Sequence, residues 1–250
     1  MYFNIIASGS KGNATLVLNN NTVILIDMGI TLTRLIEGLK EVGKSVKDID
    51  AVIFTHNHSD HISGMKFFPQ NKLYALEGTL PGELANVVKL YQPFKIKDFE
   101  ITPIKTSHDA INPCGYVLKS GDEKLVYITD TGYLLDETIS LIQNPNYLIL
   151  ESNHDIQMLL NTNRPMELKQ RILSDHGHLC NEESAFIAAM IVGHKTSEII
   201  LAHLSEEANS PELALEIYQK IFQQLRIDMT RLKIKTAWQW KSLRGGCDEN

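Results

Sequence analysis

The chain has 250 residues, of which 43% are hydrophobic and 22% charged, and its formal net charge is −6 at pH 7. This size and balance are typical of a globular domain with a sizeable core. The negative charge argues against a generally basic surface that coats DNA, although a metal-lined cleft still attracts phosphate locally. We expect one domain spanning residues 1–250, with a short polar tail at about 244–250.

No stretch reaches the uninterrupted apolar length of a membrane helix, and the first residues lack the basic start and long apolar centre of a signal peptide. The three cysteines, Cys114, Cys180 and Cys247, are far apart and odd in number. Neither a disulfide framework nor a CxxC zinc knuckle is therefore expected. We expect a cytoplasmic protein with reduced thiols and no membrane partner.

Helical and strand patterns interleave along the whole chain, which predicts an α/β protein. Apolar runs rich in β-forming residues predict strands at 2–6, 15–18, 22–26, 51–54, 73–75, 99–104, 115–118, 125–128, 147–150 and 198–202. Amphipathic stretches predict helices at 32–42, 136–143, 166–173, 182–192 and 211–225. Three asparagines at 19–21 predict a hairpin turn, and Gly43 ends the first helix.

The strand predicted at 51–54 leads directly into the segment THNHSDH at 55–61. In this HxHxDH arrangement, an extended or turning backbone directs His56 and His58 to one metal. Asp60 and His61, at the start of a following helix, reach a second. These nitrogen and oxygen ligands suit zinc, manganese or iron. The alternative is a polar turn with fortuitous histidines, which the density of the cluster disfavours.

Other polar residues also follow predicted strands. Asp130 comes after the strand at 125–128, Glu151 closes the strand at 147–150, and His203 follows the strand at 198–202. Strand ends along one edge of a sheet are where α/β proteins gather the residues of a site. We therefore expect these side chains to share one edge with the histidine segment.

The THNHSDH segment, together with Asp27 in the run LIDMG, resembles the metallo-β-lactamase superfamily, and nearly the whole chain follows its motif order. The resemblance implies an αββα sandwich, in which two mixed β-sheets pack face to face with helices on both outer faces. It also implies that Asp27 is a buried supporter of the histidine loop and does not bind metal.

The same resemblance implies two divalent metal ions, zinc or manganese first and iron as a further option. One ion would be held by His56, His58 and His108, the other by Asp60, His61 and His203, with Asp130 bridging the two. Taken alone, His108 and His203 would be ordinary loop histidines. Asp130 has an alternative role as a helix cap near Asp136 or in the turn at 131–132. Their positions after strands, in family order, favour the ligand roles.

A later series, HGHLCN at 176–181 followed by a helix, a strand and HLS at 203–205, resembles the nuclease branches of the superfamily, notably tRNA 3′-processing endonucleases. That resemblance implies that His178 contacts the scissile phosphate or assists the leaving group. A helix N-terminus beside a histidine also suits a phosphate. The alternative makes His178 a capping residue and Asn181 the N-cap.

Further substrate contacts are expected at His154, in ESNHD, at His176 and at Asn181. For His154, a structural hydrogen bond is an equal alternative. The small-residue loop at 7–13, which contains Ser10 and Asn13, offers backbone amides to a substrate. Together, ASGSKGNATLV, ESNHD and HGHLCN resemble the YycJ (WalJ) family of bacterial 5′-to-3′ DNA exonucleases. The non-ligand Asn57 replaces the threonine or small residue of many members.

The leading hypothesis is a dinuclear-metal phosphodiesterase acting on DNA. A metal-activated hydroxide would attack phosphorus, Asp60 would orient it as well as bind metal, and His178 would assist departure of the alcohol. One alternative is hydrolysis of a small ester, a thioester or a cyclic nucleotide by the same metal pair. Another is a non-catalytic metal-binding regulatory module.

Overall fold

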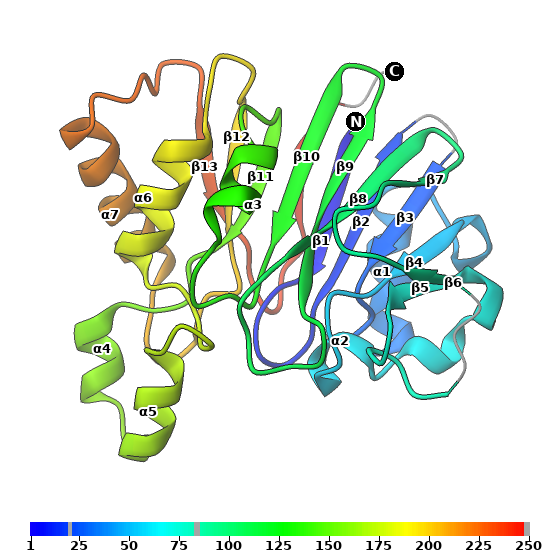
Figure 1. Cartoon of the computed structure of the whole chain (residues 1–250), viewed down its shortest axis with the longest axis horizontal. Helices are drawn as coiled ribbons and strands as arrows, with labels where there is room; N and C mark the ends of the chain where they lie inside the picture. The colour runs from blue at the N-terminus through cyan, green and yellow to red at the C-terminus, as the bar shows by residue number, and fades with distance from the viewer. Residues whose placement is uncertain (20–21, 83–85, 248–250) are drawn as a thin grey trace.

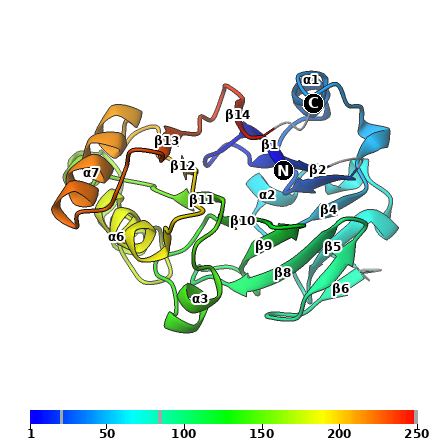
Figure 2. The same cartoon turned by 90° about the horizontal axis from the view of Figure 1, so that it is seen from above.

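The computed structural model describes residues 1–19, 22–82 and 86–247. In this part of the chain, two seven-stranded mixed sheets lie against each other and helices cover their outer faces (Figures 1 and 2). The predicted αββα sandwich is therefore confirmed. No helix of the described residues has the length and apolar character needed to cross a bilayer.

The first sheet has the strand order β14-β1-β2-β3-β4-β5-β6. Its strands are β1 (Tyr2–Ala7), β2 (Ala14–Asn19), β3 (Thr22–Ile26), β4 (Ala51–Ile53), β5 (Leu73–Leu76), β6 (Asn86–Val88) and β14 (Leu243–Gly246). Neighbours from β14 to β3 pair antiparallel, whereas β3, β4, β5 and β6 run parallel. The parallel strands all end at the same edge.

The second sheet has the order β13-β12-β11-β10-β9-β8-β7. Its strands are β7 (Phe94–Ile96), β8 (Phe99–Lys105), β9 (Cys114–Ser120), β10 (Glu123–Ile128), β11 (Tyr147–Glu151), β12 (Glu198–Ala202) and β13 (Lys233–Thr236). Strands β10 to β13 are parallel and in register, with Ile128 opposite Leu150 and Leu150 opposite Leu201. The residues that follow β10, β11 and β12 are therefore side by side.

The helices are α1 (Leu32–Lys40), α2 (Ser59–Ile62), α3 (Asp136–Leu141), α4 (Ile156–Asn161), α5 (Met166–Ile172), α6 (Asn181–Ile191) and α7 (Pro211–Gln224), with short 3-10 turns at Val46–Asp48, Met65–Phe67 and Gln70–Lys72. Helix α1 ends at Lys40, two residues before the predicted end. Gly43 lies in the turn that follows, with φ +65°, a left-handed conformation that glycine adopts without strain.

Three apolar layers hold the sandwich together. Facing residues of both sheets, including Phe3, Ile24, Tyr116 and Ile149, form the core between them. One outer layer packs α1 against the first sheet, and the other packs α6 and α7 against the second. The central strands β3, β11 and β12 are buried throughout, which explains their continuous apolar sequences.

Some predicted boundaries differ from the structure. The tail predicted from residue 244 begins as strand β14, which pairs with β1 through Leu243 to Gly246. The short strands β6, β7 and β13 and helix α4 were not predicted. These strands have three or four residues each, too few for a clear alternation of side chains. The predicted hairpin turn at 19–21 includes residues 20–21, which lie outside the described residues.

Candidate metal centre

The histidine segment turns sharply between β4 and α2. His58 is the N-cap of α2, and the short helix carries Asp60 and His61. The ring centroids of His56 and His58 lie 4.6 Å apart, and those of His56 and His61 lie 4.0 Å apart. Four potential ligands are therefore gathered by a single loop and the first turn of a helix, as the HxHxDH spacing indicated.

Residues from other strand ends complete four overlapping groups of possible metal ligands among the described residues. In each group, one nitrogen or oxygen atom per residue lies within 4.8 Å of the others. Two of the groups are the triads His56, His58 and His108, and Asp60, His61 and His203. The other two are His56, His61 and Asp130, and Asp130, Glu151, His178 and His203. The structure thus brings together the two triads that the resemblance implied.

Asp130 lies between the two triads. Its carboxylate oxygens lie 3.3 Å from Nε2 of His61, 3.5 Å from Nε2 of His203 and 3.8 Å from Nε2 of His108. Burial would raise the pKa of Asp130, but the neighbouring His203 and His61 outweigh burial and hold this pKa well below its ordinary value. An ionised carboxylate in this position is suited to link two cations.

Three buried residues at this edge have left-handed backbone conformations: Asp27 (φ 59°), Asp130 (φ 56°) and His203 (φ 56°). Such φ values are uncommon for residues with a side chain and cost free energy. Each of the three follows a strand directly or within two residues. The strained turns point these side chains into the space between the strand ends.

Asp27 supports the histidine loop through buried hydrogen bonds, as expected. It is fully buried and accepts hydrogen bonds from the backbone N–H of Thr55 at 2.8 Å and from its hydroxyl at 2.9 Å. Its Oδ2 atom lies 2.8 Å from Nδ1 of His61. Burial lowers the pKa of His61, but Asp27 and Asp130 outweigh burial and raise it well above the ordinary value. The Asp27 contact orients Nε2 of His61 toward the metal centre.

Glu151 has a role that the sequence analysis did not assign. Its Oε1 atom lies 2.7 Å from Nδ1 of His178 and 3.0 Å from Nδ1 of His203, and its Oε2 atom accepts the N–H of Thr131 at 2.9 Å. Burial opposes ionisation, but His178 and His203 outweigh it and lower the pKa of Glu151 to about 2. The sequence signal that could have indicated this role is a carboxylate at the end of a fully buried strand.

The donor set fits divalent cations. Nε2 of His56, Oδ2 of Asp130 and Nε2 of His203 are buried and lack a hydrogen-bond partner among the described residues. Buried polar atoms without partners are costly, so their convergence on one space fits a site for a positive ion. Imidazole and carboxylate ligands are those of zinc, manganese and iron sites.

Two of the expected substrate residues are accessible beside this centre. His178 has 19% of its side chain exposed, and its ring centroid lies 5.0 Å from that of His108 and 5.3 Å from that of His203. His176 is exposed and its Nδ1 atom lies 3.1 Å from the Ser107 hydroxyl. His176, Ser107 and His108 line a small pocket of about 150 Å³.

Other expected substrate residues are buried. His154 is 1% exposed, and neither of its ring nitrogens has a hydrogen-bond partner in the part of the chain that the structure describes. Asn181 is fully buried, and its amide bonds to Ser152 and Asn209. These two side chains face the protein interior and present no surface to a substrate.

The small-residue loop joins the metal centre through Asn13. This residue is fully buried, and its Nδ2 atom lies 2.9 Å from Nε2 of His61 and 3.1 Å from the carbonyl oxygen of Gly9. Ser10, by contrast, is exposed at the tip of the loop. Of the two residues expected to contact substrate here, Asn13 therefore holds the loop against the site, and Ser10 faces solvent.

The N-terminus of α6 is already capped by the protein. Its N-cap is Cys180, whose backbone N–H donates to the Glu183 carboxylate at 3.3 Å, while Sγ accepts the N–H of Glu183. Glu182 adds a second carboxylate to the first turn. The expectation of a free helix terminus for phosphate is therefore wrong, since the Glu183 carboxylate occupies it and the charge of Glu182 adds negative potential there. The alternative of Asn181 as N-cap is also wrong, by one residue.

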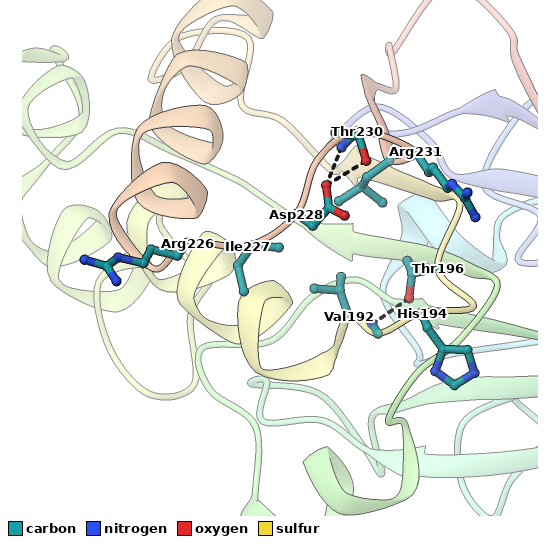
Figure 3. A pocket seen from close by; sticks show the side chains of 10 residues that line it. Val192, His194, Thr196, Arg226, Ile227, Asp228, Thr230 and Arg231 are labelled. Atoms are coloured by element: carbon teal, nitrogen blue, oxygen red, sulfur yellow. Dashed lines mark hydrogen bonds between the residues drawn. The ribbon is translucent and has the colours of Figure 1, made fainter.

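A larger cavity of about 570 Å³ lies at the opposite end of α6, where this helix and α7 end. Its charged side chains do not converge, because Arg226 and Arg231 point in different directions (Figure 3). Asp228 is bonded to Thr230 within its own turn. No group of metal ligands among the described residues includes these side chains.

The site has the organisation of a known class of enzyme. Residues 22–203 match the family model of the beta-lactamase superfamily domain, and the chain belongs to this superfamily, here in its metallo-β-lactamase fold. It is 34% identical over 227 residues to exodeoxyribonuclease YycJ of Bacillus anthracis, covering 86% of each chain. Exodeoxyribonuclease WalJ of Streptococcus pneumoniae serotype 2 is also 34% identical, over 85% of this chain and 84% of that protein.

Among solved structures, the metallo-beta-lactamase fold protein YhfI from Bacillus subtilis matches with a TM-score of 0.72 and 19% identity, over 98% of this chain and 99% of that one. That likeness concerns the fold. Together with the ligand groups, the family and the relatives establish the protein as a metal-dependent hydrolase.

Proposed function

We propose that the protein hydrolyses phosphodiester bonds of DNA at a dinuclear metal centre and removes nucleotides in the 5′-to-3′ direction. The observation that carries the proposal is His178, a partly exposed histidine held by Glu151 beside the ligand triads. The names of the two relatives, both exodeoxyribonucleases, support DNA as the substrate.

Two divalent ions, zinc or manganese first and iron as a further option, would be held by the two triads and by Asp130. When bound, such ions lower the pKa of a water molecule and neutralise charge on the reacting oxygens. Asp60 has 23% of its side chain exposed beside His61, a position from which its carboxylate can orient the attacking water. The other ligand side chains hold their positions through buried contacts such as that of Asp27 with His61.

His178 is positioned to supply the proton that the leaving oxygen needs. Its Nδ1 atom faces the Glu151 carboxylate at 2.7 Å, so the proton available to the substrate is on Nε2. After transfer of that proton, the neutral ring remains bonded to Glu151. A positioned general acid of this kind contributes about 10²- to 10⁴-fold to a reaction rate.

The test compares a leaving group that needs a proton with one that leaves without a proton. Metal-loaded wild type is expected to release nucleotides from 5′-labelled DNA, and His178→Ala to slow this release about 10²-fold or more. The same variant should retain turnover of thymidine 5′-(p-nitrophenyl) phosphate, because nitrophenolate leaves without a proton. The exposed His194→Ala variant is the matched control.

Two results would overturn the proposal. The first is a metal-loaded wild type that releases no nucleotide from DNA. The second is a His178→Ala variant that digests DNA at the wild-type rate. Turnover of a small ester, a thioester or a cyclic nucleotide in place of DNA would point to the alternative hydrolase, and a retained cellular phenotype in Asp60→Ala would point to a non-catalytic module.

A further inference from the structure

The loop between β13 and β14 carries both tryptophans of the chain, Trp238 and Trp240. Between them, Gln239 is 5% exposed and fixed by two hydrogen bonds: its Oε1 atom accepts the N–H of Lys11 at 2.9 Å, and its Nε2 atom donates to the carbonyl oxygen of Gly12 at 3.0 Å. The tryptophan loop is therefore fastened to the small-residue loop at 7–13.

The small-residue loop in turn touches the metal ligands. Asn13 lies 2.9 Å from Nε2 of His61, and the Ser8 hydroxyl accepts the backbone N–H of His203 at 2.8 Å. The backbone N–H of Ser8 donates to the carbonyl oxygen of Trp238 at 3.1 Å. A single layer of residues thus separates the tryptophan loop from the candidate metal centre.

Trp240 is held in place although most of its side chain faces solvent. It is 65% exposed, and Trp238 is 48% exposed. The indole N–H of Trp240 donates to Oε1 of Glu206 at 2.6 Å. Folding leaves this large ring exposed but restricts its rotation, so a planar ligand would bind with little further loss of side-chain entropy.

Two cations lie over the Trp240 ring. The Nζ atom of Lys11 lies 5.4 Å from a ring centroid, and the guanidinium carbon of Arg34 lies 5.3 Å from one. Lys11 also pairs with Glu206 at 2.7 Å, and Arg34 donates to the carbonyl oxygens of Ile6 and Gln239. An aromatic face beside positive charge is the arrangement that proteins use for single-stranded nucleic acid.

We infer that Trp240 stacks on a nucleobase of single-stranded DNA, while Lys11 and Arg34 attract the adjoining phosphates. This inference rests on the proposed function, and it defines the strand form that the site takes. A base within a duplex has both faces covered by its neighbours, whereas a base in a single strand has a face free for the indole ring. The strand would run from this loop across the small-residue loop to the metal centre.

The test measures binding apart from cleavage. A fluorescently labelled, phosphorothioate-linked oligothymidylate, which resists hydrolysis, is titrated with wild type and variants. Stacking of about 1–3 kcal/mol per base corresponds to about a 5- to 150-fold weaker Kd for Trp240→Ala. Trp240→Phe should recover part of the affinity because it keeps a ring. Phe186→Ala removes a similarly exposed ring from α6 and should leave the Kd unchanged.

A second readout assigns the contact. In Trp238→Phe, Trp240 is the sole tryptophan, and we expect the oligonucleotide to quench its fluorescence. Turnover of bis(p-nitrophenyl) phosphate, which has no base to stack, should be the same in Trp240→Ala as in wild type. Melting temperatures of all variants establish that they are folded.

The inference is overturned if Trp240→Ala binds the oligothymidylate with the wild-type Kd. It is also overturned if the substitution weakens binding of duplex DNA as much as binding of single-stranded DNA. These results differ from failure of the proposed function. If wild type digests DNA and Trp240→Ala has the same KM for DNA, the stacking inference is refuted and the proposed function stands. If wild type digests no DNA, the proposed function is refuted. If wild type also fails to bind the oligothymidylate, the stacking inference is refuted as well.

Discussion

The Oε1 atom of Glu151 lies 2.7 Å from Nδ1 of His178, inside the protein and beside the candidate metal centre. The same oxygen lies 3.0 Å from Nδ1 of His203. One buried carboxylate therefore orients a metal-ligand candidate and the proposed general acid together. Because Glu151 fixes both rings by their Nδ1 atoms, each Nε2 atom faces the space where substrate and metal meet.

We predict that Glu151→Gln lowers both metal affinity and turnover, each by about 10- to 100-fold, as is typical of residues that orient metal ligands. The amide has no charge to stabilise protonated His178, and its NH₂ group conflicts with ring N–H donors. Metal content is measured by mass spectrometry and turnover with labelled DNA. Glu167→Gln on α5 is the control, and equal values for Glu151→Gln and wild type would contradict this role.

Removal of the Asp27 carboxylate should destabilise the histidine loop. In Asp27→Ala, the buried N–H and hydroxyl of Thr55 and the Nδ1 atom of His61 lose their acceptor. We expect a loss of about 3 kcal/mol in the free energy of unfolding, together with weaker metal binding. Urea denaturation measures the loss. The exposed Asp122→Asn should unfold at the wild-type midpoint, and the same midpoint for Asp27→Ala would refute the prediction.

His154 should make stability depend on pH. Burial lowers the pKa of this side chain to about 4, against about 6.5 in an unfolded chain. Between these values the unfolded state binds more protons, so His154 lowers the stability of the fold as the pH falls from about 6.5 toward 4. Above this window both states are neutral and the residue contributes no pH dependence.

His154→Leu should therefore become more stable relative to wild type by about 2 kcal/mol between pH 8 and pH 5. The free energy of unfolding of both proteins is measured at each pH, so that metal loss in acid affects both alike. His194→Leu, at an exposed position, should follow wild type. A constant difference between His154→Leu and wild type across this range would contradict the assignment.

Chelation should lower the melting temperature. Without cations, the buried atoms Nε2 of His56, Oδ2 of Asp130 and Nε2 of His203 have no hydrogen-bond partner among the described residues. A metal that binds only the folded state stabilises it by about 2.7 kcal/mol at a hundred times its Kd. We expect added zinc or manganese to restore the melting temperature in wild type and only partly in Asp130→Asn. Identical melting curves with and without chelator would argue against a metal centre.

Local sequence patterns were sufficient for the α/β class and for the residues that follow strands, whereas the αββα sandwich was implied by the family resemblance. The HxHxDH segment places four candidate ligands on one loop, and Asp130 and His203 follow strands that a buried apolar pattern identifies. Asp130 and His203 are adjacent because the parallel strands β10, β11 and β12 end at a common edge of the second sheet. The HxHxDH segment follows β4 of the first sheet, so the expectation of one shared sheet edge is wrong, and the site lies between strand ends of both sheets. Whether each of them binds metal stays a prediction.

Properties that depend on tertiary packing could not be read from the sequence. The burial of His154 and Asn181 depends on segments that pack over them from elsewhere in the chain, such as Asn209 against Asn181. The role of Glu151 requires His178 and His203, which are 27 and 52 residues away. Strand β14 forms only because β1 offers an edge, so its polar sequence was interpreted as a tail.

The most direct test of the account is a titration of metal-free protein with manganese, in which bound metal per chain and nucleotide release from 5′-labelled DNA are measured in the same samples. We expect release to rise with bound metal and to reach its maximum at two ions per chain. A protein that holds two ions and releases no nucleotide, or one that reaches its full rate without metal, would contradict the account.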